Sequence, residues 1–311
     1  MLYSLIKLLV RLALRIFCRK IDIRGHRYLE TGGPLLIVAN HPNSFLDAII
    51  IGALFEKRVH FLARGDAFNK PWHNYLLRLL HMIPIYRLSE GKENLSLNEK
   101  AFRHSSEILQ KGGIVLIFIE GICVNKHELQ PFKKGATRIA CDNRELKGLQ
   151  VLPVGLAYDS FDRFGKKIAI DLCPPLSINE IMIFSELVRN YKRLNSVLFE
   201  TLNVHIRVPQ KQKGQSLQSR ILFFVPALAG YVLHAPLYYP LRNFIRKKTK
   251  GTVFYDSVLL GSLLLLYPLY LLILLLLLAS LGAPFLTILI FLLLHPLLAW
   301  FAVTIREHLN F

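Results

Sequence analysis

The chain has 311 residues, with 39 Lys and Arg against 21 Asp and Glu, a formal net charge of +18 and a hydrophobic fraction of 53%. This length allows one sizeable domain and a smaller one. The charge suits a nucleic-acid binder or a protein on an anionic membrane, and the apolar content favours the membrane. Four scattered cysteines form no Cys-x-x-Cys pair, which argues against a disulfide framework or a zinc site and fits a reducing compartment.

Residues 1–20 predict an amphipathic helix at a membrane interface. Basic residues recur every four positions and so lie on one side of a helix: Lys7, Arg11, Arg15 and Arg19. Leucines cover much of the remaining surface, and no acidic residue precedes Asp22. An ordinary amphipathic helix packed on a soluble domain stays open as the alternative.

From residue 21 to residue 210, short apolar or alternating runs predict strands, and longer periodic segments predict helices. Strands are expected at 21–25, 34–38, 59–63, 81–87, 114–119, 149–157 and 167–172, and helices at 48–54, 71–82, 95–111, 178–204 and from residue 136. This alternation predicts an α/β domain over 21–210, with a mixed sheet flanked by helices.

One turn in this pattern carries a histidine and an aspartate. His41 and Asp47 lie between the apolar run at 34–38 and the helix expected at 48–54, among turn and cap residues. An imidazole held by a carboxylate is a general base, and strand-to-helix turns often carry such chemistry. The plainer interpretation, in which Asp47 only caps the next helix, stays open on this stretch alone.

A second carboxylate follows the clearest buried strand. Glu120 and Gly121 come directly after the apolar run at 114–119. A carboxylate at the end of a core strand is costly to bury without a partner, so we expect Glu120 to belong to a site. The alternative is a solvated residue that begins a loop.

Taken in order, four blocks resemble the glycerolipid acyltransferases of the PlsC type, over roughly residues 20–205. The blocks are Asn40-His41 with Asp47, Pro84-Ile85-Tyr86-Arg87, Phe118-Ile119-Glu120-Gly121 with Pro131-Phe132-Lys133-Lys134-Gly135, and Val151-Leu152-Pro153-Val154. Members of this family are membrane enzymes that move a fatty acyl group from acyl-CoA or acyl-carrier protein to a hydroxyl of glycerol phosphate or a lysolipid.

The resemblance implies a role for each matching residue. His41 is the general base, and Asp47 fixes its tautomer. Arg87 faces the phosphate of the acceptor, because a guanidinium binds phosphate oxygens bidentately. The other substrate-binding positions are Glu120, Gly121, Lys133 and Lys134, of which the two lysines could equally form a solvated surface pair. We expect no metal, and no cofactor other than the acyl donor.

The sequence departs from the family pattern in two places. Five residues separate His41 from Asp47, where the family usually has four, so the turn must bulge by one residue for Asp47 to reach the ring. The family's Glu-Gly pair is normally followed by Thr-Arg, whose Arg is a phosphate ligand, but here Ile122 and Cys123 follow. We therefore expect a changed acceptor, or compensation by Arg87 and nearby lysines.

The C-terminal third, residues 211–311, predicts a membrane domain. Residues 257–305 contain no Asp, Glu, Lys or Arg, and a span needs about 20 apolar residues. Spans at 258–279 and 284–305 would form a hairpin whose basic flanks lie in the cytoplasm. Residues 221–241 are also apolar but contain Pro226, Pro236 and Pro240. Basic residues at both ends favour a segment that re-enters or lies in the interface, with a plain span as the alternative.

These observations together predict a membrane acyltransferase of phospholipid biosynthesis, bacterial and facing the cytoplasm from the inner membrane. Its acceptor would be lysophosphatidate or glycerol 3-phosphate, and its partners membrane lipids and acyl-CoA or acyl-carrier protein, with no nucleic acid. Two alternatives stay open. One is O-acylation of a lyso-aminolipid or another hydroxylated lipid, and the other is a non-catalytic lipid-binding membrane protein of the same fold.

Overall fold

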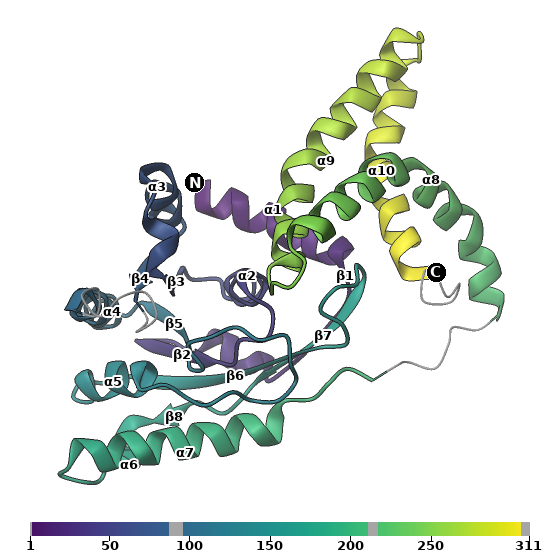
Figure 1. The fold of residues 1–311 in the computed structure, drawn as a ribbon. Coiled ribbons are helices and arrows are strands. Elements are labelled where there is room, and N and C mark those ends of the chain that lie inside the picture. The colour runs from purple at the N-terminus through teal and green to yellow at the C-terminus, as the bar shows by residue number, and fades with distance from the viewer. Residues whose placement is uncertain (1, 87–95, 211–216, 306–311) are drawn as a thin grey trace. The chain divides into compact units, whose positions relative to one another are not determined.

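The computed structural model describes residues 2–86, 96–210 and 217–305 (Figure 1). The chain divides into two compact units. The first, which we call the α/β unit, comprises residues 1–5, 22–157 and 169–208, and the second, which we call the helical unit, comprises residues 6–21, 158–168 and 209–311. Helix α1 spans Leu2–Phe17, and the chain then continues as strand β1. Residues 18–20 are therefore extended and do not belong to the helix predicted over 1–20.

The sheet has the order β1-β7-β6-β2-β5-β3-β4, with β8 beside β6. Its strands are β1 (Cys18–Arg24), β2 (Leu35–Ala39), β3 (Val59–Arg64), β4 (Met82–Ile85), β5 (Ile114–Phe118), β6 (Gln150–Tyr158), β7 (Lys166–Leu172) and β8 (Leu176–Ser177). Strand β2 runs parallel to both β5 and β6, β3 runs parallel to β5 and β4, and β8 is antiparallel to β6. The predicted mixed sheet is confirmed.

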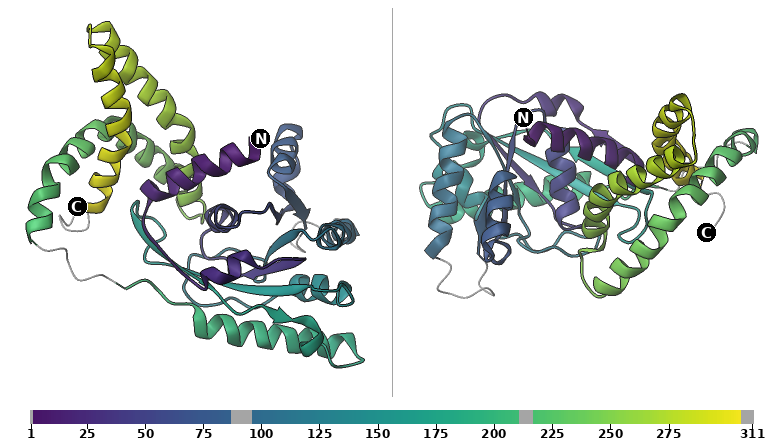
Figure 2. Two further views of the ribbon diagram at one scale, coloured as in Figure 1. Left: turned by 180° about the vertical axis from the view of Figure 1, so that it is seen from behind. Right: turned by 90° about the horizontal axis from the view of Figure 1, so that it is seen from above.

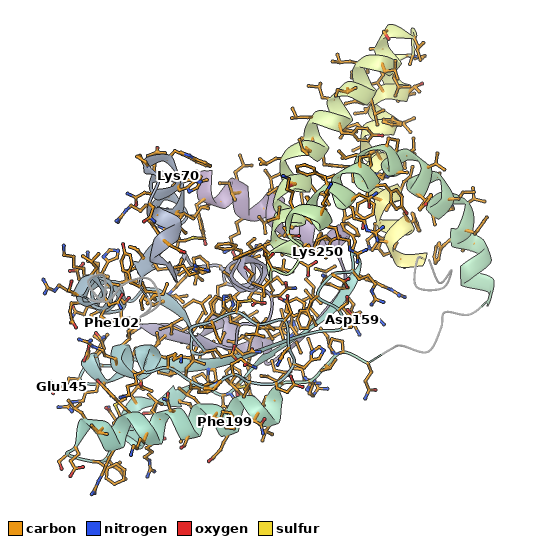
Figure 3. The ribbon with its side chains drawn as sticks, in the orientation of Figure 1. Lys70, Phe102, Glu145, Asp159, Phe199 and Lys250 are labelled. Atoms are coloured by element: carbon orange, nitrogen blue, oxygen red, sulfur yellow. The ribbon has the colours of Figure 1, made fainter. Side chains whose placement is uncertain are left out.

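The central strands are buried because helices cover both faces of the sheet. All five side chains of β2 are fully buried, which explains its uninterrupted apolar sequence. Leu36 and Val38 join a core cluster with α4 (Asn98–Gln110), α5 (Gly135–Asp142) and α7 (Leu187–His205). Helix α2 (Phe45–Leu54) covers the opposite face (Figures 1 and 2). Phe102 of α4, which is labelled in Figure 3, belongs to this cluster.

Two helices differ from the prediction: one ends earlier than predicted, and the other is interrupted. Helix α3 covers Pro71–Leu79, so the prediction of 71–82 was too long, because β4 begins at Met82. The segment at 178–204 is not one helix but α6 (Ile178–Ile181) followed by α7. The Asn190 side chain holds the break: its Oδ1 accepts from the Phe184 amide at 3.1 Å, and its Nδ2 donates to the Phe184 carbonyl at 2.7 Å.

The helical unit contains three long apolar helices, α8 (Leu217–Lys248), α9 (Tyr255–Ser280) and α10 (Phe285–Ile305). Among the described residues, each has a stretch long and apolar enough to cross a membrane. The predicted hairpin at 258–279 and 284–305 corresponds to α9 and α10. Residues 221–241 lie inside the continuous helix α8 in spite of three prolines, so this segment contains no turn that sends it back. Whether it crosses the membrane or lies in its interface stays a prediction.

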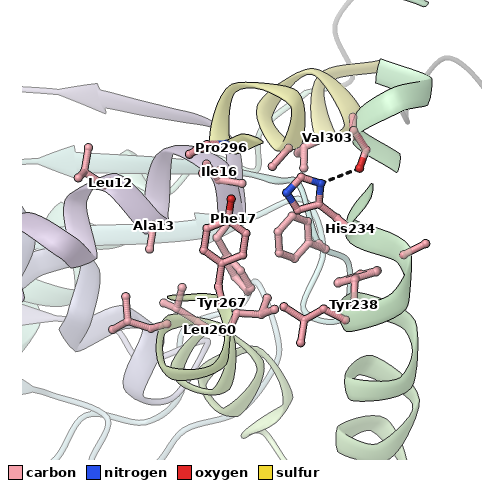
Figure 4. A pocket seen from close by; sticks show the side chains of 18 of the residues that line it. Leu12, Ala13, Ile16, Phe17, His234, Tyr238, Leu260, Tyr267, Pro296 and Val303 are labelled. Atoms are coloured by element: carbon pink, nitrogen blue, oxygen red, sulfur yellow. Dashed lines mark hydrogen bonds between the residues drawn. The ribbon is translucent and has the colours of Figure 1, made fainter. Parts of the chain in front are cut away.

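A pocket of about 350 Å³ lies within the helical unit (Figure 4). Its walls are almost wholly aliphatic and aromatic, and its lining includes Phe17, Phe164 and Leu260. His234 also lines it, with Nδ1 2.7 Å from the Gly230 carbonyl. Of the predicted acyl-transfer residues that the structure describes, none lines this pocket, so the candidate site is sought elsewhere.

Candidate active site

The site begins where β2 ends. Asn40 follows the strand, and its buried side chain pairs with the backbone of Leu156 in β6. Its Nδ2 donates to the Leu156 carbonyl at 2.9 Å, and its Oδ1 accepts from the Leu156 amide at 2.7 Å. This pairing fixes the path of the chain as it leaves the sheet, and so the backbone of His41.

His41 and Asp47 are in direct contact. His41 Nδ1 lies 2.9 Å from Asp47 Oδ2, which also accepts from the Asn43 amide at 2.7 Å. The Asp47 side chain is fully buried, and the His41 side chain is 15% exposed. Because a carboxylate oxygen accepts hydrogen bonds, the proton of the neutral ring lies on Nδ1 and the lone pair on Nε2. The pair therefore has the arrangement of a general base held in one tautomer.

Ser44 accommodates the extra residue between His41 and Asp47. Its backbone angles are φ 52° and ψ −140°, in a region that residues with a side chain rarely occupy. The amides of Leu46 and Asp47 donate to the carbonyls of Asn43 and Ser44, both at 3.2 Å, so α2 begins directly after this residue. The bulge that the five-residue gap requires lies at Ser44, and Asp47 reaches the ring.

The imidazole is also held by an aromatic ring. Phe118 stacks on His41 with ring centroids 3.8 Å apart and an interplanar angle of 11°. Phe118 is the last residue of β5 and pairs in register with Ala39 of β2. The stacking of Phe118 on His41 was not predicted from the sequence, because it depends on the register of two parallel strands that are far apart in the chain.

Glu120 ties three segments together. Its Oε2 accepts from the His41 amide and its Oε1 from the Gln130 amide, both at 2.9 Å. The residue is only 3% exposed, and this burial raises the pKa of its carboxyl above the usual value, although the two amide donors act in the opposite direction. The buried carboxylate thus has two amide donors, and one of them is the backbone of His41.

Residues 123–125 run along the His41 turn. Cys123 Sγ accepts from the Ser44 amide at 2.9 Å, and Asn125 Nδ2 donates to the Pro42 carbonyl at 2.8 Å. The Val124 amide donates to the His41 carbonyl at 3.4 Å. In the sequence, Cys123 was notable only because it stands where the family has an arginine. Its contact with the turn was not predicted.

The remaining predicted site residues are less tightly held. Lys133 and Lys134 are exposed, and the Lys133 side chain crosses Gly121, where a Cβ would lie 2.9 Å from Lys133 Cγ. Gly121 has φ +64°, so both the contact and the backbone require glycine at this position. Val151 to Val154 lie in β6 beside β2. Arg87 lies outside the described residues.

The arrangement supports proton transfer. Among residues 2–86, 96–210 and 217–305, no group of three or more His, Cys, Asp or Glu side chains is placed to hold a metal ion. The buried Asp47 and the stacked Phe118 hold the ring, and Nε2 is the nitrogen left for a substrate proton. A neutral imidazole held in this way accepts a proton from a hydroxyl that lies within hydrogen-bond reach.

Comparison with known proteins finds a family match over the part of the chain that contains this site. Residues 20–157 match the family model described as Acyltransferase. They include the His41 turn, Glu120 and the strand at 151–154. This part of the chain therefore matches the acyltransferase family model, which agrees with the resemblance that the order of its motifs predicted.

Two curated relatives share this region. The chain is 28% identical over 138 residues to a chloroplastic 1-acyl-sn-glycerol-3-phosphate acyltransferase of Brassica napus, covering 44% of this chain and 37% of that protein. It is 30% identical over 121 residues to the 1-acyl-sn-glycerol-3-phosphate acyltransferase of Pseudomonas aeruginosa, covering 39% and 43%. The matches thus span less than half the length of these relatives.

A solved structure also aligns with the chain. It is the 1-acyl-sn-glycerophosphate (LPA) acyltransferase PlsC of Thermotoga maritima, at 20% identity and a TM-score of 0.46, covering 64% of this chain and 79% of that chain.

Proposed function

We propose that this protein transfers a fatty acyl group from a thioester donor to the free hydroxyl of a 1-acylglycerol 3-phosphate, a step of phospholipid biosynthesis. The observation that carries the proposal is the 2.9 Å contact between His41 Nδ1 and Asp47 Oδ2. The curated relatives, which are named for this reaction, support the choice of acceptor. Glycerol 3-phosphate is the other acceptor within the same class.

In the proposed mechanism, His41 Nε2 accepts the proton of the acceptor hydroxyl as the oxygen attacks the thioester carbonyl. The buried Asp47 stabilises the imidazolium that forms. When the tetrahedral intermediate collapses, the C–S bond breaks and the imidazolium returns its proton to the thiolate that leaves. The acyl group thus passes from sulfur to oxygen, and the protein forms no covalent intermediate.

The donor and the location follow from the same proposal. Acyl-CoA or acyl-carrier protein supplies the thioester, and no further cofactor takes part. The three helices of membrane-crossing length among the described residues and the net charge of +18 favour a protein held at an anionic membrane. We place it in a bacterial inner membrane, with the α/β unit facing the cytoplasm.

One observation favours a second acceptor. The Cys123 side chain stands where the family has a phosphate-binding arginine, and its sulfur accepts from the Ser44 amide. A cysteine side chain in this position offers no positive charge to a phosphate monoester. An O-acyltransferase for a lyso-aminolipid or another hydroxylated lipid without a phosphate monoester is therefore the alternative enzyme.

The test is acyl transfer by the purified protein in detergent. The donors are acyl-CoA and acyl-carrier protein, and the acceptors are lysophosphatidate, glycerol 3-phosphate and a lyso-aminolipid. His41→Ala and Asp47→Asn should lower kcat by about 10²–10⁴-fold, the usual contribution of general base catalysis. His104→Ala is the matched control, because His104 is exposed on α4, where its Nδ1 lies 3.4 Å from Glu107 Oε2.

The outcomes distinguish three hypotheses: acyl transfer to lysophosphatidate, acyl transfer to an acceptor without a phosphate monoester, and lipid binding without catalysis. Transfer to lysophosphatidate that is lost in His41→Ala and kept in His104→Ala supports the main proposal. Transfer only to an acceptor without a phosphate monoester supports the second acceptor. Transfer that is equal in His41→Ala would refute the role of the base, and no transfer to any acceptor would favour a non-catalytic lipid-binding protein.

A further inference from the structure

One side of helix α3 carries large apolar side chains that the fold does not cover. None of the nine residues of α3 is buried. Four of them are large and exposed: Trp72 by 64%, Tyr75 by 73%, Leu76 by 43% and Leu79 by 39%. Their spacing places them in a single stripe of an α-helix. A contiguous exposed patch of this kind marks an interaction surface, whereas single exposed apolar residues do not.

Basic and polar side chains lie beside this stripe. Lys70 precedes α3, and Arg78 lies in its last turn. Away from the apolar stripe, Arg78 Nε donates to Asn74 Oδ1 at 2.7 Å. Residues 70–81 include no Asp or Glu. Basic residues beside an apolar stripe that contains Trp and Tyr are the composition of a helix lying in a membrane interface.

We propose that α3 lies on the surface of an anionic bilayer, with Trp72 and Tyr75 at the level of the headgroups and Leu76 and Leu79 at the acyl boundary. A bilayer fits the stripe better than another protein would. Among the described residues, three other helices are long and apolar enough to cross a membrane, so a bilayer is the apolar surface that these helices imply. The basic flanks of α3 also complement anionic lipid.

The position of α3 within the α/β unit gives this contact a consequence. Helix α3 follows β3 and leads through His81 into β4, the edge strand of the sheet. The Tyr3 ring packs on the His81 ring with centroids 5.1 Å apart, so the first turn of α1 lies at the end of α3. Contact through α3 would therefore hold the β4 edge of the sheet against the lipid surface.

The two tryptophans of the chain, Trp72 and Trp300, allow a direct test that does not depend on acyl transfer. The full-length Trp300→Phe protein, whose only tryptophan is Trp72, is reconstituted into phosphatidylcholine–phosphatidylglycerol vesicles. Some of the phosphatidylcholine carries bromine at a shallow or a deep position of its acyl chain. We expect quenching of Trp72 fluorescence, stronger with the shallow bromine, because the ring of a bound α3 lies near the headgroups.

Two substitutions on opposite sides of the helix sharpen the test. Leu76→Glu in the apolar stripe should lower the quenching of Trp72 by at least about twofold, because it places a charge at the acyl boundary. Asn74→Glu makes the same change in charge on the polar side and should leave the quenching unchanged. Circular dichroism and size-exclusion chromatography establish that both variants fold.

The Trp72→Phe protein reports on Trp300 of α10 and shows whether reconstitution succeeded. Quenching of Trp300 without quenching of Trp72 would overturn the proposal, because it would mean that protein or water surrounds α3. Equal losses of quenching in Leu76→Glu and Asn74→Glu would also overturn it, because the stripe would then have no special role.

Discussion

The backbone amide of Ser44 donates a hydrogen bond to Cys123 Sγ. This contact joins the two places where the chain departs from the pattern of its family. Ser44 absorbs the fifth residue between His41 and Asp47 in a strained conformation, and Cys123 replaces an arginine. The backbone conformation of Ser44 directs its amide toward Cys123, and the sulfur accepts the hydrogen bond of that amide. The two departures therefore form one structural feature.

The effect of replacing Cys123 on stability and acyl transfer should therefore depend on whether the new side chain can accept the hydrogen bond of the Ser44 amide. Cys123→Ser keeps an acceptor and should stay close to the wild type in stability and in acyl transfer. Cys123→Val has a similar size but no acceptor, and it leaves the amide of the buried Ser44 unpaired, which costs about 1–3 kcal/mol. Thermal unfolding and kcat of the purified protein measure both effects. Equal behaviour of the Ser and Val variants would show that the hydrogen bond is unimportant.

The strain at Ser44 predicts an unusual response to glycine. Residues with a side chain in such regions cost about 1–3 kcal/mol, and glycine adopts them freely. Ser44→Gly should therefore leave the unfolding free energy unchanged or raise it by about 1 kcal/mol. Ser105→Gly is the control, because Ser105 lies buried within helix α4 and its Oγ donates to the Ala101 carbonyl at 2.8 Å, so glycine there should lower stability by at least about 0.5–1 kcal/mol. A clear loss of stability in Ser44→Gly would argue against strain at this residue.

Glu120 predicts a pH dependence whose sign follows from its burial. Burial raises its pKa above the usual carboxyl value of 4.5, so in this pH range the folded protein binds more protons than the unfolded chain. Its contribution to stability is present in full below pH 4.5 and is lost as the pH rises through the raised pKa. The Glu120→Gln variant lacks this titration. The NH₂ group of its side chain would also face the backbone N–H of either His41 or Gln130, so that two donors meet and one hydrogen bond is lost.

We therefore expect Glu120→Gln to unfold at a lower temperature than the wild type, with a gap that narrows as the pH rises above 4.5. Thermal unfolding of both proteins across this range measures the gap. A gap that widens with pH would show that the two amide donors outweigh desolvation, so that the pKa of Glu120 is lowered and not raised.

In the helical unit, Lys166 and Asp256 form an ion pair whose side chains are both fully buried. Removing one partner leaves a buried charge without its counterion, so Lys166→Met should destabilise by about 3–5 kcal/mol. The double variant Lys166→Met/Asp256→Leu should recover much of this loss. Denaturant unfolding in detergent measures all three proteins. The exposed pair of Arg246 and Asp162 is the control, and breaking it should cost no more than about 1 kcal/mol.

The sequence alone determined the strands and helices that a pattern of neighbouring residues reveals. The apolar runs of β2, β5 and β6 identified buried strands, because strands covered on both faces have no polar side to display. The absence of charge over residues 257–305 identified α9 and α10, because a charged side chain inside a bilayer is costly. The order of the motifs indicated the acyltransferase family and singled out His41, Asp47 and Glu120 as candidate site residues.

Only the tertiary structure decided what these residues touch. Whether Asp47 reaches His41 across five residues depends on one pair of backbone angles at Ser44, and no sequence pattern specifies them. The stacking of Phe118 on His41 depends on the register of β2 against β5, and the role of Cys123 depends on a contact across 79 positions of the chain. Local sequence sets the conformations that a segment prefers, whereas packing between distant segments determines which side chains meet.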